Sequence, residues 1–211
     1  MDLNSTDSNF QDIHERQPLL KQRGIITMPY YMDYDSFKEV AWALDFWKFD
    51  SVLSGRPIIK FIGNGGNFSA TTAIGELMRD YNAIGILAGG SYSGHTIAFM
   101  MCPERYVYDS AYFGIHSASI YPTDRPYTNA DFRIEAETHD YLDNQVAQLF
   151  AKESQRNKFD AAYWKKIHEE ARLSTKLISG LELVHQYGLA KSMLEFPQDE
   201  LWRIGRGNDR I

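Results

Sequence analysis

Residues 83–102 read "AIGILAGGSYSGHTIAFMMC", two apolar runs joined by a turn of small and polar residues. The first run, "AIGILAGG", predicts a buried strand, and the second, "SGHTIAFMMC", predicts a buried helix. The turn between them carries Ser91, Ser93 and His95. A serine at a helix start is usually a cap for the first backbone N–H groups. At a strand-to-helix junction it can instead be a nucleophile, because the helix dipole favours a developing oxyanion there.

The segments on both sides repeat the pattern of a strand followed by a helix. Upstream, "GIITM" and "RPIIKFIG" predict strands, and "SATTAIGELMRDY" predicts a helix with one apolar face. The run "DYDSFKEVAWALDFWKFDS" predicts another helix, with Asp35 or Ser36 as its cap. Downstream, "RYVYDSAYFGIHSAS" predicts a fourth strand region, which ends at His116. This alternation is typical of an α/β fold with a mainly parallel sheet.

The second half of the chain is expected to be mostly helical. Residues 130–155 carry the longest amphipathic pattern, with a cap near Asn129. The run "FDAAYWKKIHEEARL" predicts a shorter helix. The run "SGLELVHQYGLAKSM" predicts a final helix, a glycine stop at Gly188 and a short strand.

Length and composition favour one globular domain. The chain has 211 residues, with residues 1–18 expected as a flexible arm, 19–194 as the domain and 195–211 as a tail. The net charge of −6 argues against a nucleic-acid partner, and no apolar run approaches a membrane span. The single cysteine, Cys102, fits a reducing compartment. We therefore expect a cytoplasmic protein with neither a nucleic-acid nor a membrane partner, and no pattern predicts a cofactor or a metal.

Flexible and polar residues follow several of the predicted strands. The turns "GNGGN" and "AGGSYSG", together with His116, all fall at carboxyl ends of strands, where parallel sheets bind ligands. Adjacent glycines bring backbone N–H groups close to a ligand, so "GNGGN" can form an oxyanion hole or hold phosphate. It can equally be an ordinary strand-to-helix turn. It matches neither the Walker pattern nor GxGxxG.

A nucleophilic serine needs a base, and the chain offers six histidines. His95 lies two residues from Ser93, and such helical positions do not face each other. His116 ends the strand that follows the serine helix, so it comes within reach if that strand lies beside the serine's own strand. The remaining histidines lie in the arm or in predicted helices. Neither serine lies in the GxSxG motif of the hydrolases that use it.

Taken together, these motifs resemble those of the Clp protease proteolytic subunit (ClpP) family of serine peptidases. The resemblance extends from about Leu19 to Met193. It rests on "LLKQRGIITM", "IIKFIGNGGNFSATTAIGELMRDY", "GGSYSGHTIAFMMC", "RYVYDSAYFGIHSAS" and "ISGLELVHQYGLAKSM", five segments in the family's order. The chain is similar to a divergent member, of a kind found in phage.

The resemblance implies a fold and a set of roles. The fold would be a crotonase-like superhelix of repeated β-β-α/β-α units, with the helix at 130–155 as a protruding handle. Ser93 would be the nucleophile and His116 the general base, and the N–H groups of Gly66 and Gly94 would form the oxyanion hole. The family forms heptameric rings stacked in pairs, gated by the N-terminal arm. An AAA+ unfoldase feeds them unfolded polypeptide.

The sequence departs from the family at the third member of the catalytic triad. Thr175 stands at the position of the family's aspartate. A threonine hydroxyl can orient His116 but cannot stabilise its imidazolium by charge, a loss worth about 10⁴ in rate in the triad template. The segment Gly94-His95 also replaces the family's usual Met-Gly. A catalytically weak or inactive ring subunit, a phage capsid-maturation protease and a crotonase-type acyl-CoA enzyme therefore remain as alternatives.

Overall fold

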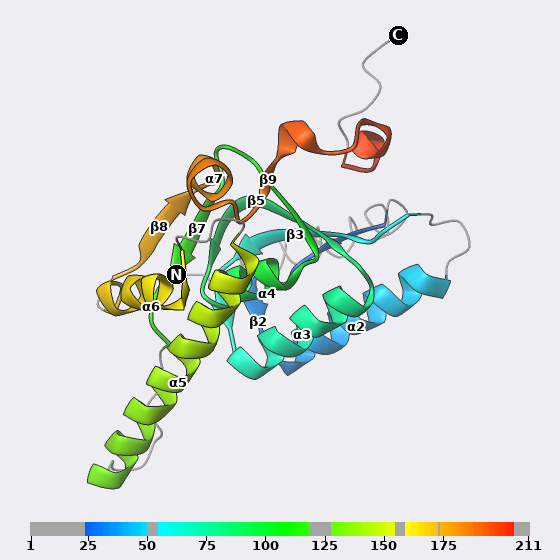
Figure 1. The fold of residues 1–211 in the computed structure, drawn as a ribbon. Coiled ribbons are helices and arrows are strands. Elements are labelled where there is room, and N and C mark those ends of the chain that lie inside the picture. The colour runs from blue at the N-terminus through cyan, green and yellow to red at the C-terminus, as the bar shows by residue number, and fades with distance from the viewer. Residues whose placement is uncertain (1–23, 50–54, 119–127, 155–158, 173, 205–211) are drawn as a thin grey trace, which may run out of the picture.

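Helices pack on a mostly parallel sheet in this protein (Figure 1). The computed structural model describes residues 24–49, 55–118, 128–154, 159–172 and 174–204. Among these residues, one sheet contains five strands that follow one another in parallel: β1 (Ile25–Thr27), β3 (Ile58–Gly63), β5 (Ile84–Tyr92), β6 (Glu104–Val107) and β9 (Lys191–Ser192). The sheet is completed by β7 (Tyr112–Ile115), parallel to β5, and by β8 (Lys176–Ser179), antiparallel to β7. The expected α/β class is confirmed.

The long strand β5 organises the sheet, because different parts of it pair with different neighbours. Its first half pairs with β6 and its last residues pair with β7. The single strand region expected around "RYVYDSAYFGIH" is therefore wrong, since it contains two strands. Asp109 and Ser110, both good turn residues, lie between them, and the N–H of Ala111 donates to the Tyr108 carbonyl at 2.9 Å.

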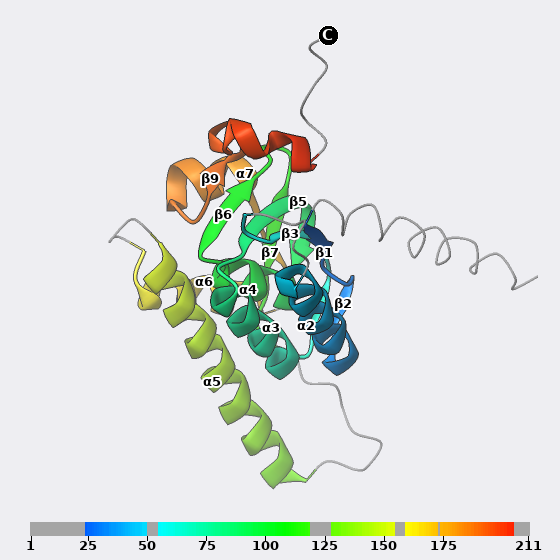
Figure 2. The same cartoon turned by 90° about the vertical axis from the view of Figure 1, so that its right-hand side faces the viewer.

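Two apolar layers cover the two faces of the sheet. Helices α2 (Tyr34–Phe49), α3 (Phe68–Asp80) and α4 (Gly94–Met101) lie on one side in both views (Figures 1 and 2). Neighbouring residues of one strand serve different layers: Ile59 packs with the helices, whereas Ile58 faces the smaller cluster on the other side. This alternation follows from the two-residue period of strand side chains. The smaller cluster comprises Ile25, Ile58, Ile84, Ile86, Tyr106, Met193 and Phe196.

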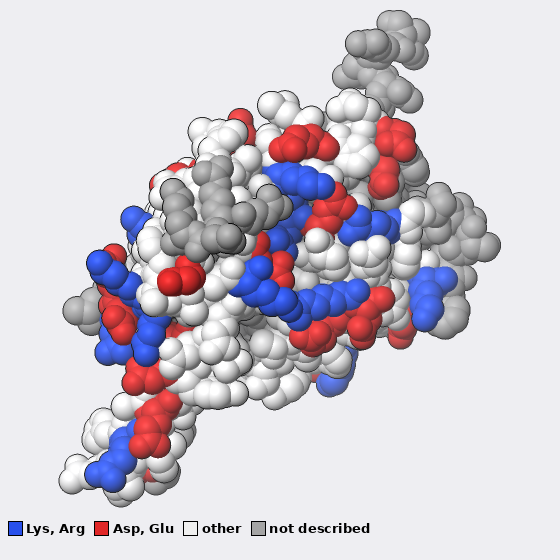
Figure 3. Space-filling model, in the orientation of Figure 1, with Lys and Arg blue, Asp and Glu red and all other residues white. Residues whose placement is uncertain are grey.

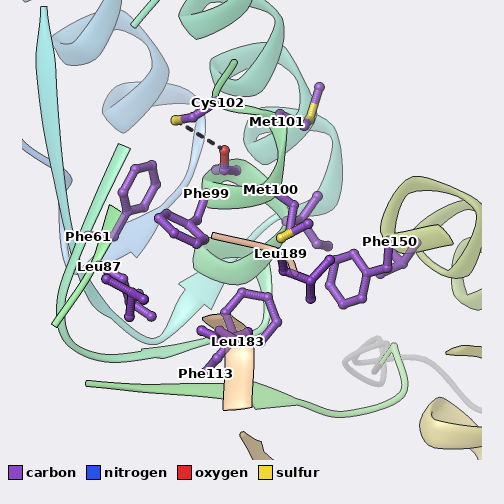
Figure 4. Packing of buried hydrophobic residues seen from close by; sticks show 14 of the residues in the cluster. Phe61, Leu87, Phe99, Met100, Met101, Cys102, Phe113, Phe150, Leu183 and Leu189 are labelled. Atoms are coloured by element: carbon purple, nitrogen blue, oxygen red, sulfur yellow. Dashed lines mark hydrogen bonds between the residues drawn. The ribbon is translucent and has the colours of Figure 1, made fainter. Parts of the chain in front are cut away.

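Helix α4 lies at the centre of the larger cluster, and all its residues are buried. Figure 4 shows Phe99 of α4 among the aromatic rings of neighbouring elements. Its ring centroid lies 5.4 Å from that of Phe61 and 6.2 Å from that of Phe113, and Phe113 lies 5.6 Å from Phe150. These contacts join β3, α4, β7 and helix α5 (Asn129–Glu153) through one row of rings.

The helix starts show which expected caps form. The expected cap of α2 at Asp35 or Ser36 is wrong: the helix begins earlier, and the Asp33 carboxylate accepts from the Ser36 N–H at 2.8 Å. For α5, the cap is Thr128, next to the expected Asn129, and it forms a capping box with Asp131. Helix α6 (Ala161–Glu170) is capped by Asp160.

Helix α5 projects from the body of the molecule in both views (Figures 1 and 2). Its buried residues, Asp143, Val146, Ala147 and Phe150, all lie in its second half. The first half carries large exposed apolar side chains, namely those of Phe132, Ile134 and Tyr141. Only the second half of α5 therefore belongs to the core.

The C-terminal part of the fold extends beyond the expected domain end. Helix α7 (Gly180–Glu182) and a π-helical turn (Leu183–Tyr187) end at Gly188, whose φ of 64° is the left-handed stop expected there. The expected tail, residues 195–211, contains a core residue. Phe196 is buried, and its ring centroid lies 4.9 Å from that of Tyr106. The expected arm at 1–18 lies outside the described residues.

Both signs of charge lie side by side on the face that Figure 3 shows. Glu104 accepts hydrogen bonds from Arg56, Lys191 and Tyr106. Burial raises the pKa of the Glu104 carboxyl, but these donors together lower it to about 2. In the part of the chain that is described, no helix has the length and apolar character needed to cross a membrane.

The role of Phe196 in the second core predicts a clear stability difference. Phe196→Ala is expected to lower the free energy of unfolding by about 3–5 kcal/mol, because it leaves a cavity against Tyr106. Leu194→Ala is the matched control, since Leu194 lies in the same segment and is 84% exposed; its effect should stay within about 0.5 kcal/mol. Urea unfolding measures both. Equal small effects would mean that this segment does not stabilise the domain.

Candidate active site

Ser93 lies at the junction of β5 and α4 in a strained backbone conformation. Its φ of 52° and ψ of −124° are those of the first central residue of a type II′ turn, a position that normally takes glycine. For a residue with a side chain, such a conformation costs about 1–3 kcal/mol and occurs mainly at functional sites. Nucleophilic serines of hydrolases occupy the same kind of sharp strand-to-helix turn.

The surrounding backbone holds Ser93 in this conformation. Its N–H donates to the Gly114 carbonyl at 3.1 Å, across from β7. Its carbonyl accepts from the Thr96 N–H at 2.9 Å and the Thr96 hydroxyl at 2.5 Å. The Ser93 hydroxyl makes no capping bond to α4, so the interpretation of Ser93 as an ordinary helix cap is wrong. The hydroxyl is left available for other chemistry.

His95 explains how this turn forms without a GxSxG motif. In that motif the second residue after the serine is glycine, and here it is His95, which is fully buried. Space for the His95 ring is left by Gly63 of β3, which has no side chain. A Cβ on Gly63 would lie only 2.6 Å from His95 Nε2. His95 Nε2 donates to the Pro29 carbonyl at 2.7 Å, and burial lowers the pKa of the imidazole. His95 is therefore a structural residue that holds the segment before β2 through its bond to the Pro29 carbonyl.

The structure separates the two serines of the turn. Ser91 is fully buried, and its hydroxyl has no hydrogen-bond partner among the described residues. Ser93 is half-buried and lines a cleft of about 710 Å³. Only Ser93 can therefore meet a ligand in this cleft.

Glycines that line the same cleft bring backbone N–H groups close to Ser93. The turn "GNGGN" contains the short strand β4 (Gly65–Gly66), which pairs in parallel with β2 (Tyr31–Met32). Gly65 lies directly against the serine turn, since a Cβ on it would come within 2.4 Å of the Gly94 nitrogen. A Cβ on Gly94 would lie 3.1 Å from the Gly66 nitrogen. The expected oxyanion-hole residues, Gly66 and Gly94, are thus neighbours, and first-turn N–H groups such as that of Gly94 have no acceptor within the helix.

His116 follows β7 and lines the same cleft as Ser93. Its Nδ1 lies 2.6 Å from the carbonyl oxygen of Ser117. A carbonyl oxygen only accepts, so Nδ1 carries the proton and Nε2 is the basic nitrogen. Because β7 lies beside β5, the strand before His116 neighbours the strand before Ser93, which is the condition under which His116 was expected to come within reach.

Thr175 is near His116 but does not contact its ring through a hydrogen bond. It immediately precedes β8, in which Lys176 pairs with Ile115, so the next pair in register would be Thr175 with His116. Thr175 is exposed and is not among the residues that line the cleft. In the described part of the chain, His116 Nδ1 is bonded to the Ser117 carbonyl instead. The expected orienting role of Thr175 stays a prediction.

The cleft is also lined by two buried ionisable side chains to which the sequence assigned no role. They are Asp143 on α5 and His168 on α6, each almost fully buried. A signal for Asp143 was present, because it lies three residues before Val146 on the apolar face of an amphipathic helix. The rest of the lining is partly apolar and includes Phe68, Ile97, Ile115, Leu142 and Val146.

A hydroxyl, an imidazole and two backbone N–H groups around one cleft are the groups needed for acyl transfer. No model of a known protein family matches the chain, and no curated protein matches it. The geometry of the cleft is therefore the basis for assigning a function.

Backbone strain at Ser93 predicts an unusual order of stabilities. Ser93→Gly should be more stable than Ser93→Ala by about 1 kcal/mol, because glycine accepts a φ of 52° without strain. Ser91 lies within β5, before the turn. There, the glycine variant should instead be less stable than the alanine variant by about 0.5–1 kcal/mol. Denaturant unfolding of the four variants measures both differences. Alanine more stable than glycine at both positions would contradict the strained turn.

Proposed function

We propose that this chain is a serine peptidase of the Clp proteolytic subunit type. In this proposal, Ser93 and His116 hydrolyse peptide bonds of unfolded polypeptides inside a ring-shaped chamber. The observation that carries the proposal is the strained turn at Ser93, which presents the hydroxyl to a cleft shared with His116, Gly66 and Gly94. Strain of this kind is retained where a function requires it.

The proposed reaction follows from the protonation of His116. With Nδ1 protonated and bonded to the Ser117 carbonyl, Nε2 takes the Ser93 proton as Oγ attacks the scissile carbonyl carbon. The carbonyl oxygen becomes an oxyanion, which the N–H groups of Gly66 and Gly94 stabilise. His116 then gives the proton to the leaving amine, and the C–N bond breaks. Water, activated by His116, releases the acyl group from Ser93 in the second half of the reaction.

The shape and lining of the cleft support a peptide substrate. It is lined by residues of the short β2–β4 pair, in which Gly66 is exposed. Apolar side chains of α4 and α5 also line it, among them Ile97 and Val146. An extended peptide can align its backbone with a strand and place an apolar side chain in such a pocket.

The proposal includes assembly into stacked heptameric rings of this chain. The projecting half of α5 supports it, because Phe132, Ile134 and Tyr141 are exposed there and a second copy would bury them. The crotonase-like superhelix, the delivery of substrate by an AAA+ unfoldase and an axial gate at residues 1–18 belong to the same proposal.

A catalytically weak or inactive ring subunit is the second candidate. One observation favours it: Thr175, at the position where the family carries its acid, supplies neither a charge nor a hydrogen bond to His116. The two candidates differ only in whether Ser93 reacts.

Reaction with a fluorophosphonate tests the proposed peptidase. Wild-type protein should be labelled at Ser93, and it should cut a fluorescein-labelled unfolded polypeptide into peptides. Ser93→Ala should abolish both signals, because the nucleophile is gone. Ser91→Ala is the matched control and should still be labelled, since the Ser91 hydroxyl is buried away from the cleft. Intact-mass spectrometry reads the labelling. Folded, assembled wild-type protein that remains unlabelled would favour the inactive subunit.

A further inference from the structure

A buried carboxylate contacts the chain immediately after His116. Asp143 of α5 is 4% exposed. Its carboxylate accepts from the Ser117 hydroxyl at 2.5 Å and from the Ala118 N–H at 2.9 Å. These two bonds hold the two residues that follow the candidate base, and they come from a different element of the fold.

We propose that Asp143 is a positioning residue for His116. It fixes the Ser117 carbonyl that accepts the His116 Nδ1 proton, and it supplies the negative charge that Thr175 lacks. This inference rests on the proposed function, because it assigns Asp143 a task in the same reaction.

The contacts form a continuous path from α5 to the imidazole. The Asp143 carboxylate accepts from the hydroxyl of Ser117 and from the backbone N–H of the next residue, Ala118. The Ser117 carbonyl in turn lies 2.6 Å from His116 Nδ1. The backbone before Ser117 is also held, because His168 Nδ1 lies 3.3 Å from the His116 carbonyl. The peptide unit that orients the ring is thus fixed on both sides.

Among the described residues, no lysine or arginine pairs with the Asp143 carboxylate. The ionisable group beside it is His168, whose Nδ1 lies 3.9 Å from the carboxylate. Burial lowers the pKa of His168 while Asp143 raises it, with burial the larger effect, so the imidazole is mainly neutral near pH 7. Lys176 of β8, opposite Ile115, is exposed to solvent. The negative charge of Asp143 would stabilise the imidazolium that His116 becomes when it takes the Ser93 proton.

The chain supplies a matched control on the same helix. Asp140 lies about one turn before Asp143 and is exposed, where it pairs with Arg172 at 3.1 Å. Asp143→Asn and Asp140→Asn each remove one negative charge from α5. Only the first changes the contacts of Ser117 and Ala118. Screening by water makes exposed ion pairs nearly neutral in effect.

The test measures the second-order rate of fluorophosphonate labelling at Ser93 as a function of pH. Asp143→Asn should lower the plateau rate by about 10²-fold, the size of effect expected from misplacing a reacting group. Its acid limb should move to lower pH, because removal of the negative charge disfavours the imidazolium that His116 becomes when it takes the Ser93 proton. Asp140→Asn should retain the wild-type rate within about twofold and keep the acid limb unchanged.

Ser117→Ala is the second variant. It removes the bond from the Ser117 hydroxyl to Asp143 but keeps the bond from the Ala118 N–H. The labelling rate should therefore fall by a smaller factor, and the acid limb should move in the same direction as in Asp143→Asn. If thermal unfolding shows that Asp143→Asn does not fold, Ser117→Ala tests the role of Asp143 in its place.

Each outcome decides between the proposals. Normal labelling in wild type with equal rates in Asp143→Asn and Asp140→Asn would overturn the role of Asp143 and leave the serine hydrolase intact. A slower rate with an unmoved acid limb would reduce Asp143 to a structural residue and also overturn the inference. Wild-type protein that is not labelled at all would overturn the proposed function itself, and the role of Asp143 with it.

Discussion

The complete burial of α4 is the constraint on which the rest of the structure depends. A helix that is apolar on all sides must be surrounded, and Phe99 achieves this by packing between rings from β3 and β7. The start of the helix is thereby fixed beneath the ends of those strands. The chain has only one residue, Ser93, in which to turn from β5 into α4, and the strained backbone at that residue is the consequence.

The strain at Ser93 is tolerated because small residues on neighbouring strands make room for it. Gly63 leaves space for the His95 ring, and Gly65 lies against the backbone of Tyr92 and Gly94 and the Cβ of Ser93. Gly65 also lines the cleft beside Gly66, so the backbone that leaves room for the turn continues into the candidate oxyanion hole of Gly66 and Gly94. The Ser93 N–H is bonded to Gly114 of β7, the strand that leads into His116. Three strand ends thus build one site.

The features that could be predicted from the sequence are those set by the periodicity of apolar residues and by the order of strands and helices. The α/β class and the positions of most helices followed from strands and helices in alternation, whereas the choice of Ser93 with His116, which line one cleft, rested on the resemblance of the motifs to a known family. The sequence did not predict β2 and β4, because two-residue strands have no period to detect. Phe196 was missed because a lone aromatic after a domain end carries no pattern, and Asp143 because its partners lie 25 and 26 residues away in the chain. These features depend on tertiary contacts.

The central claim is that Ser93, His116 and the backbone of Gly66 and Gly94 form one acyl-transfer site. An experimental structure of the protein after reaction with diisopropyl fluorophosphate tests it most directly. We expect phosphorus on Ser93 Oγ, with the phosphoryl oxygen about 3 Å from both glycine nitrogens and His116 Nε2 facing the ester oxygens. A phosphoryl oxygen directed into solvent, or an adduct on another residue, would contradict the account.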